Sequence, residues 1–133
     1  MLLYSICWGF ESLRAYILNF MTYLGNDFYC DVALKNDSLL KKEYESGQVF
    51  AYHHTRPLWP VHIVVLPKKH ISSFSALSKD ETPILLEIIE VLKTLAAKIE
   101  KENGGARILT NIGVYQDSKH LHWHITSGEP IRL

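Results

Sequence analysis

Histidine alternates with apolar residues in segment 120–126, where one large apolar residue separates His120 from His122 and another separates His122 from His124. Successive side chains of a β-strand point to opposite faces, so a strand here places the three imidazoles on one face and the apolar residues on the other. A neutral imidazole has an ordinary pKa of about 6.5 and keeps a lone pair at neutral pH. The pattern therefore indicates nucleophilic catalysis by one histidine, while its neighbours move protons or bind phosphoryl oxygens.

Two other interpretations of these histidines remain open. Imidazoles two residues apart on a strand stand roughly 6.5–7 Å apart and can converge on one metal ion, as a zinc site requires. Cys30 and Asp27 would add ligands, at the spacing of a C-x-x-C motif whose first cysteine is replaced. The other interpretation is a solvent-facing polar strand whose histidines are incidental.

The surrounding sequence predicts an α+β fold with an antiparallel sheet. A capping-box spacing from Ser78 to Glu81, followed by apolar residues at helical intervals, predicts one long helix that stops at Asn103 before two glycines. Residues 35–38 are typical of a turn, and two prolines within 56–60 require a loop. The segments whose patterns favour strands are 28–34, 49–55, 62–66, 107–111 and 119–126.

Composition restricts the classes of function. The chain has 133 residues, 47% of them hydrophobic and 21% charged, which is the balance of a single globular domain. Its 14 basic and 14 acidic residues give a net charge of zero, so we expect no nucleic acid and no membrane as a partner. Cys7 and Cys30 are the only cysteines, too few for a disulfide framework, which favours a reducing, cytoplasmic location.

Residues 1–24 precede the predicted domain and are rich in apolar side chains. Glu11 and Arg14 interrupt the apolar run, which is too short for a membrane span and lacks the basic start of a signal peptide. Apolar residues at helical spacing predict an amphipathic helix from Glu11 to Leu24. An extension without a role in the chemistry is the alternative. We therefore divide the chain into an N-terminal extension, 1–24, and a domain, 25–133.

Three motifs together resemble the histidine triad (HIT) superfamily, and specifically its nucleotide-binding hydrolase (Hint-like) branch. The first motif is the alternating segment 120–125. The second is the block 50–71, which contains His62 and a Pro-Lys-Lys-His run, and the third is an Asn-x-Gly element at 111–113. The resemblance extends over residues 28–127, and the three motifs in this order are far more specific than any one of them.

The resemblance implies about five antiparallel strands crossed by the long helix, in a HIT-like fold that forms a homodimer by pairing two sheets. It implies a purine nucleotide substrate, with AMP as the expected product, released from an amine, acyl or phosphate leaving group. The activity would be that of a nucleoside phosphoramidase or a dinucleoside polyphosphate hydrolase, and it requires no cofactor. A nucleotide-binding or scaffold protein with little turnover is the alternative.

Residue by residue, the resemblance makes His122 the nucleophile that becomes nucleotidylated. His120 and His124 flank it, holding its tautomer and contacting phosphate, and His62 is a fourth histidine beside the triad. The positions implied in substrate binding are Asn111 at the phosphate, Gln116 and Asp117 near the leaving group, Tyr29 and Val32 on a strand that walls the base pocket, and His54 near the ribose.

Two of these positions depart from the family's pattern. His54 stands where an Asp usually holds the ribose hydroxyls, and Asp117 stands where a Ser is common. A carboxylate repels a phosphate unless it holds a cationic leaving amine or is turned away. We therefore expect an altered substrate preference with the core chemistry intact.

Overall fold

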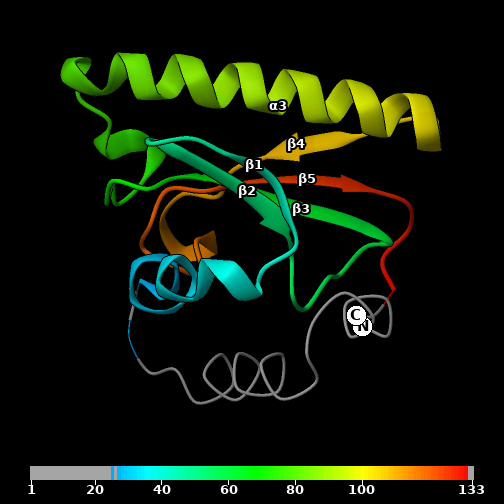
Figure 1. Ribbon diagram of the computed structural model, residues 1–133, viewed down its shortest axis with the longest axis horizontal. Helices are drawn as coiled ribbons and strands as arrows, with labels where there is room; N and C mark the ends of the chain where they lie inside the picture. The colour runs from blue at the N-terminus through cyan, green and yellow to red at the C-terminus, as the bar shows by residue number, and fades with distance from the viewer. Residues whose placement is uncertain (1–24, 26, 132–133) are drawn as a thin grey trace.

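The fold is a five-stranded antiparallel sheet with one long helix across one of its faces (Figure 1). The computed structural model describes residue 25 and residues 27–131. In this part of the chain the strands lie in the order β1-β2-β3-β5-β4, which confirms the α+β class and the antiparallel sheet. The strands are β1 (Lys42–Glu45), β2 (Val49–His53), β3 (Val61–Pro67), β4 (Arg107–Leu109) and β5 (Trp123–Ser127).

The central strands β2 and β3 are apolar on both faces because both faces of the sheet are covered. Alternate residues of β2 enter two separate clusters. Val49 and Ala51 pack beneath the long helix, whereas Phe50 and Tyr52 pack against segment 28–40 on the opposite face. Because neither side of these strands meets water, both are continuous apolar runs in the sequence.

The long helix, α3 (Thr82–Asn103), begins and ends at the residues that the sequence indicates. The Ser78 amide donates to the Glu81 carboxylate over 2.8 Å, which is half of the expected capping box, and a short 3₁₀ turn leads into the helix. At the other end Gly104 adopts a left-handed conformation, with φ of 88°, that terminates the helix. The buried residues of α3 face the sheet and are Ile88, Val91, Leu92, Leu95 and Ile99.

Segment 28–39 is helical, so the strand predicted in its first half is wrong, as is the turn predicted at 35–38. It forms a π-helical turn, Tyr29–Ala33, followed by a 3₁₀ helix, Leu34–Leu39. The Cys30 amide donates to the Asp27 carboxylate over 3.0 Å, which satisfies one backbone donor at the start of the turn. A strand would send alternate side chains to opposite faces. The helical path instead brings four apolar side chains into one buried cluster, namely Phe28, Tyr29, Ala33 and Leu40.

The sequence pattern also missed β1 and placed three strand ends incorrectly, including that of the strand predicted at 49–55, which ends at His53. Strand β1 is polar and largely exposed, and it exists because it pairs with β2 at the edge of the sheet. The strand predicted at 119–126 begins only at Trp123, because the Leu121 amide donates to the carbonyl of Ile71, which lies outside the strands. The strand predicted at 107–111 ends at Leu109.

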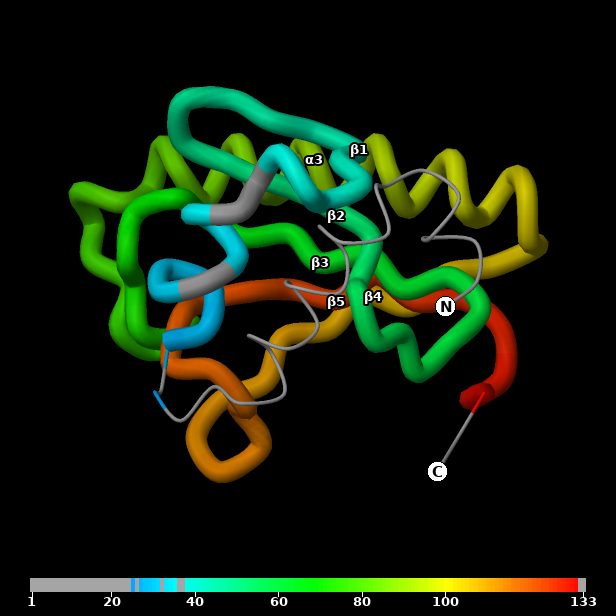
Figure 2. The backbone as a smooth tube through the Cα atoms, turned by 60° about the horizontal axis from the view of Figure 1, so that its bottom comes forward, coloured from blue at the N-terminus to red at the C-terminus, as the bar shows by residue number. Residues whose placement is uncertain are grey.

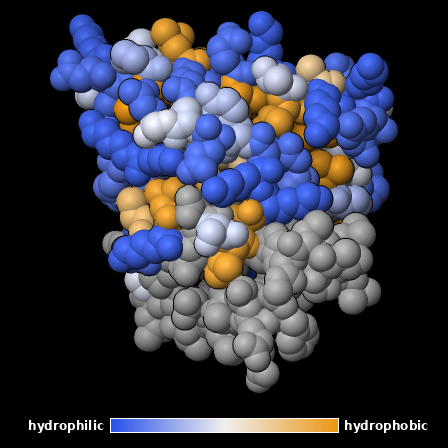
Figure 3. Space-filling view, viewed as in Figure 1, coloured by the Kyte–Doolittle hydropathy of each residue, from blue (hydrophilic) through white to orange (hydrophobic). Residues whose placement is uncertain are grey.

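The N-terminal extension lies outside the described residues. The amphipathic helix from Glu11 to Leu24 and the domain boundary after residue 24 therefore stay predictions. The described residues on the face seen in Figure 3 are mainly hydrophilic, with small, separate apolar patches. None of the helices in the described part of the chain combines the length and the hydropathy needed to cross a bilayer.

Candidate active site

Strand β5 and the residues that lead into it bring the histidines to the sheet face opposite α3. Leu121, Trp123 and Ile125 belong to the cluster beneath α3, so the intervening histidines lie on the other side, as the alternation predicts. On that side the segment passes the helical residues 28–39, which Figures 1 and 2 both show beside the loop that precedes β5. The candidate site therefore lies between β5 and this helical segment.

His122 has its proton position set by the backbone. Its Nδ1 lies 2.6 Å from the carbonyl oxygen of His120, which can only accept, so Nδ1 carries the hydrogen and Nε2 carries the lone pair. The ring is buried and lies against Tyr29, with centroids 4.6 Å apart. Burial lowers the pKa of His122 below its ordinary value, although the hydrogen bond to the His120 carbonyl opposes this. His122 is consequently neutral at pH 7, with a nucleophilic nitrogen at Nε2.

His124 has the complementary proton position. The Leu58 amide donates to His62 Nδ1 over 3.1 Å, so the hydrogen of neutral His62 is on Nε2. That nitrogen lies 2.8 Å from His124 Nδ1 and donates to it, which places the hydrogen of His124 on its own Nε2. Burial, followed by the charges that His122 and His62 would carry, lowers the pKa of His124 to about 3. His124 is therefore a neutral imidazole with a hydrogen-bond donor at Nε2.

The rings of His122 and His124 lie side by side, with centroids 5.0 Å apart. One supplies a lone pair and the other an N–H, which together suit attack on a phosphorus atom and donation to a phosphoryl oxygen or a leaving atom. Thr110 supports this arrangement, since its hydroxyl donates to the His122 carbonyl over 2.7 Å. Sequence reasoning did not single out Thr110, and no pattern around it indicated this bond.

His120 contributes to the site through its backbone carbonyl. Its ring is fully buried, and its Nε2 donates to the Pro67 carbonyl over 2.7 Å. Its Nδ1 lies 3.2 Å from both Cys30 Sγ and Asp27 Oδ2. Both ring nitrogens thus have protein partners, while the carbonyl holds the tautomer of His122. The flanking role expected for His120 is present, but the expected contact of its ring with phosphate is not supported by these contacts.

The ring of His120 belongs to a group of four ligating side chains, with Asp27, Cys30 and His70. One potential ligand atom from each lies within 4.8 Å of all the others. Two imidazole nitrogens, a sulfur and a carboxylate oxygen suit a four-coordinate zinc site, and the bond from His120 Nε2 to the Pro67 carbonyl leaves Nδ1 available as a ligand. The donor set therefore fits zinc. It replaces the expected set of three triad histidines, since His122 and His124 do not belong to this group.

The charge states within this group depend on burial. Burial and the neighbouring Asp27 raise the pKa of the Cys30 thiol to about 11, so the sulfur is protonated at neutral pH. Burial also raises the pKa of Asp27, but its bond from the Cys30 amide and the proximity of His120 outweigh this, and the net shift is downward. A bound metal ion would displace the thiol proton.

The loop between β4 and β5 contains three of the expected substrate-binding residues. Asn111 is half-buried at its start, and Asp117 is exposed. Gln116 is buried, and its side-chain amide donates to the Ser72 carbonyl over 2.6 Å, so it anchors the loop.

The other expected substrate-binding residues lie on two segments. Tyr29 lies against His122 from a helical turn and not from the expected strand, so its role in a base pocket stays a prediction, and the side chain of Val32 lies outside the described part of the chain. His54 is half-buried and stacks on His62, with centroids 4.4 Å apart and an angle of 22° between the rings. His54 therefore lies directly beside the hydrogen-bonded pair of His62 and His124.

His70 is the member of this group of potential ligands that sequence reasoning missed. It follows a Pro-Lys-Lys run at the end of β3, which is typical of a surface turn. Its Nδ1 forms a hydrogen bond with the Asp27 carboxylate and lies 4.0 Å from Cys30 Sγ. The Asp-x-x-Cys spacing is a signal in the sequence for two members of the group, but only the fold shows which two distant histidines meet them.

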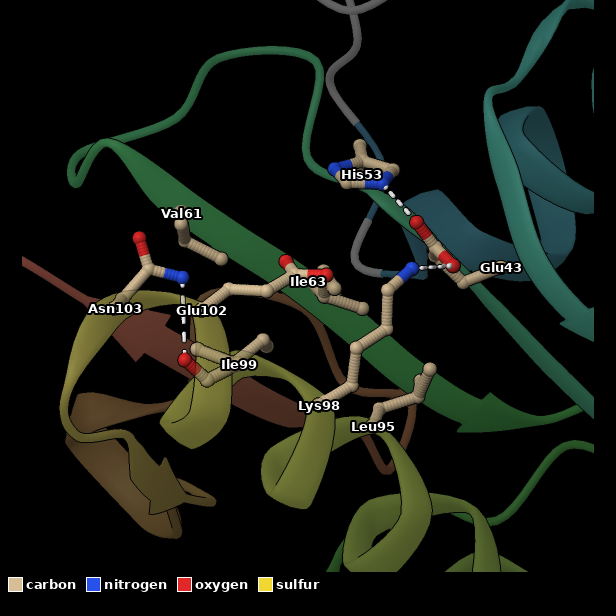
Figure 4. Close-up of a pocket in the computed structure, with 9 residues that line it drawn as sticks. All are labelled: Glu43, His53, Val61, Ile63, Leu95, Lys98, Ile99, Glu102 and Asn103. Carbon is tan, nitrogen blue, oxygen red and sulfur yellow. Dashed lines mark hydrogen bonds and ion pairs between the residues drawn. The ribbon is translucent and has the colours of Figure 1, made fainter.

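A separate hollow of about 100 Å³ lies between α3 and the sheet (Figure 4). On its rim, Glu43 lies between His53 and Lys98. Its Oε1 is 2.5 Å from His53 Nε2, and its Oε2 is 3.7 Å from Lys98 Nζ. The apolar residues that line it are Val61, Ile63, Leu95 and Ile99. None of the triad histidines lines this hollow, so it is not part of the candidate active site.

Comparison with known proteins defines the class. The family model described as HIT domain matches residues 38–131. A HIT-like protein of Chlamydia pneumoniae is 31% identical over 93 residues, which are 68% of this chain and 84% of that protein. A HIT family hydrolase from Clostridium thermocellum has a TM-score of 0.68 at 28% identity and covers 84% of this chain and 97% of its own. A hypothetical histidine triad nucleotide-binding protein from Sulfolobus tokodaii has a TM-score of 0.63 at 30% identity. The match covers 73% of this chain and 66% of that protein's chain.

This chain belongs to the HIT family, as the three sequence motifs indicated. Its fold is that of HIT hydrolases and nucleotide-binding proteins.

Proposed function

We propose that this protein is a nucleotidyl hydrolase that releases a nucleoside monophosphate, with AMP as the expected product, through a covalent nucleotidyl-His122 intermediate. The observation that carries the proposal is the 2.6 Å bond between His122 Nδ1 and the His120 carbonyl. That bond directs the lone pair to Nε2 of a buried, neutral imidazole, beside the N–H of His124. Phosphoramidates and dinucleoside polyphosphates are the substrate classes that we expect.

The reaction proceeds in two balanced steps. In the first, His122 Nε2 attacks the α-phosphorus and a P–N bond forms, while the bond to the leaving group breaks and the departing atom takes a proton from solvent; the Nε2–H of neutral His124 donates a hydrogen bond to a phosphoryl oxygen. In the second, water attacks the same phosphorus and releases a proton to solvent, and the P–N bond to His122 breaks. The product is a nucleoside monophosphate, and neither step uses a metal ion.

Replacement of the nucleophile tests this proposal. We expect His122→Ala to lower the release of AMP from an adenosine phosphoramidate by more than about a thousandfold. His53→Ala is the matched control, because His53 faces the hollow beneath α3 and lies outside the site. Undiminished turnover in His122→Ala would contradict the proposal. An unmodified protein that binds AMP but cleaves neither substrate class would favour a nucleotide-binding or scaffold protein.

A specific observation favours a second property, the binding of zinc by Asp27, Cys30, His70 and His120. Such an ion would fix His120, and thereby the carbonyl that orients His122, without taking part in the reaction. We expect about one zinc per chain by elemental analysis, and its loss in Cys30→Ser together with a lower Tm. Protein that contains no zinc after purification and after incubation with zinc would contradict this.

We also propose a homodimer and a cytoplasmic location. In the described part of the chain β4 pairs with β5 alone, so its outer edge is available to a second sheet. The reducing compartment is proposed from the low number of cysteines, of which Cys30 has a free thiol. Cell fractionation tests the location.

A further inference from the structure

The loop that precedes β5 holds an exposed carboxylate, Asp117, in a fixed position. On one side of it, the side chain of Gln116 bonds to the Ser72 carbonyl over 2.6 Å. On the other side, the hydroxyl of Ser118 accepts from the Phe28 amide over 3.0 Å. Both neighbours of Asp117 are buried. The backbone that carries this carboxylate is therefore tied to the rest of the domain at two points.

This position is close to the nucleophile. The bond from Phe28 to Ser118 joins the loop to the helical segment whose next residue, Tyr29, lies against His122 with ring centroids 4.6 Å apart. The negative charge of Asp117 also acts on His122, since it raises the pKa of that imidazole against the larger effect of burial.

The carboxylate of Asp117 has no hydrogen-bond or ion-pair partner among residues 27–131. The nearest cation along the chain is Lys119, whose ammonium donates to the carbonyls of Gly113 and Gln116 over 2.9 and 3.3 Å. The other carboxylate that acts on His122, Asp27, is buried within the ligand group. Asp117 is thus the acid of the site that is available to a substrate.

An unpaired carboxylate beside a phosphate-binding nucleophile repels the anionic substrate. The repulsion is offset if the substrate brings a positive charge to the same place. Neither a purine base nor a ribose carries a positive charge at neutral pH. Of the parts of such a substrate, the leaving group is the one that can carry this charge.

We infer that Asp117 binds a cationic substituent of the leaving group, so that preferred substrates are nucleoside phosphoramidates of amines that carry a second, positively charged group. This inference rests on the proposed function. The bond that breaks is the P–N bond to the amine, whose nitrogen takes a proton from solvent, and the diamine departs intact. Asp117 forms no covalent bond and acts as a residue that determines specificity.

Three adenosine phosphoramidates that differ only at the far end of the amine test this inference. One carries a neutral alkyl end, one an ammonium and one a carboxylate. For the unmodified protein we expect kcat/KM to be about threefold to tenfold higher for the ammonium compound than for the neutral one, and lowest for the carboxylate compound. In Asp117→Asn, the kcat/KM for the ammonium compound divided by that for the neutral compound should approach one. Added salt should reduce the ratio in the unmodified protein.

Two further variants separate this role from a structural one. Asp117→Glu keeps the charge and should keep the order of the three substrates. Asp80→Asn removes an exposed carboxylate before α3 and should leave the ratios unchanged. A wild-type ratio in Asp117→Asn, or equal kcat/KM for all three compounds in the unmodified protein, would overturn the inference. If the unmodified protein cleaves none of them, the inference is overturned, and the proposed function fails as well only if the protein also cleaves no dinucleoside polyphosphate.

Discussion

The carbonyl of His120 and the amide of Leu58 determine where the protons of three imidazoles lie. The carbonyl directs the lone pair of His122 to Nε2, and the amide, acting through His62, directs the hydrogen of His124 to its own Nε2. The bonds to His122 and to His62 involve the backbone, whereas His124 is reached through the side chain of His62, so a substitution of His62 would change which atom of His124 donates. The division of roles between nucleophile and hydrogen-bond donor therefore follows from the path of the chain and from His62.

The lowered pKa values determine the dependence of the rate on pH. Protonation of His122 removes its lone pair, and burial moves that protonation below the ordinary value of 6.5. The pKa of His124, about 3, lies lower still. We therefore expect kcat/KM, as the pH falls from about 8, to reach half of its plateau value only below pH 6.5. Initial rates, corrected for uncatalysed hydrolysis of the phosphoramidate, measure this profile. Half-loss of kcat/KM at or above pH 6.5 would contradict it.

Single residues were predictable where a pattern is local. The alternation in 120–126 was sufficient to place His122 and His124 on one face, and the motif around His62 identified a partner. The ligand group of His120 was not predictable, because it requires His70 and Asp27 to meet across the fold. Cys30 and Asp27 were identified as potential ligands, but only the structure shows which histidines they face.

Elements were predictable where the sequence carries their boundaries. Helix α3 has a capping box before it and a left-handed glycine after it, and the central strands are continuous apolar runs. Segment 28–39 was mispredicted because its alternation of apolar and polar residues suits a strand, while its burial against β2 and β3 selects a helix. Strand β1 has no apolar pattern and depends on its partner β2.

The end of α3 provides a test at this scale. We expect Gly104→Ala to lower the free energy of unfolding by about 1 kcal/mol, because a Cβ is unfavourable at its φ of 88°. Gly105→Ala is the matched control, since it lacks a positive φ and a Cβ at either glycine meets no atom within 4 Å. Urea denaturation measures both variants. Equal losses in the two would show that backbone conformation at Gly104 is not the cause.

The whole molecule combines a net charge of zero with the proposed local phosphate site and a sheet in which β4 is one of the two edge strands. In strand β4, Ile108 is 48% exposed although it lies between Arg107 and Leu109 in a paired strand. An exposed apolar residue on an open edge is a feature that a second copy would cover. The fold predicts where pairing would occur, whereas the sequence predicted a dimer only through its resemblance to the family.

Substitution at this edge tests the dimer. We expect the unmodified protein to have the mass of two chains by light scattering, and Ile108→Lys to shift it toward one chain, since a charge at the centre of the interface disfavours pairing. Exposed Ile89 lies on α3, away from β4, so Ile89→Lys should leave the mass unchanged. A single-chain mass for the unmodified protein at micromolar concentration would contradict the proposed dimer.

The covalent intermediate is the most direct test of the proposed mechanism. The protein is mixed with a slowly hydrolysed adenosine phosphoramidate, quenched, digested and mapped by mass spectrometry under conditions that preserve phosphorus–nitrogen bonds. We predict one added adenylyl group, located on His122 and absent from His122→Ala. Product formation without an adenylylated histidine, or an adenylyl group on another residue, would contradict the proposed mechanism.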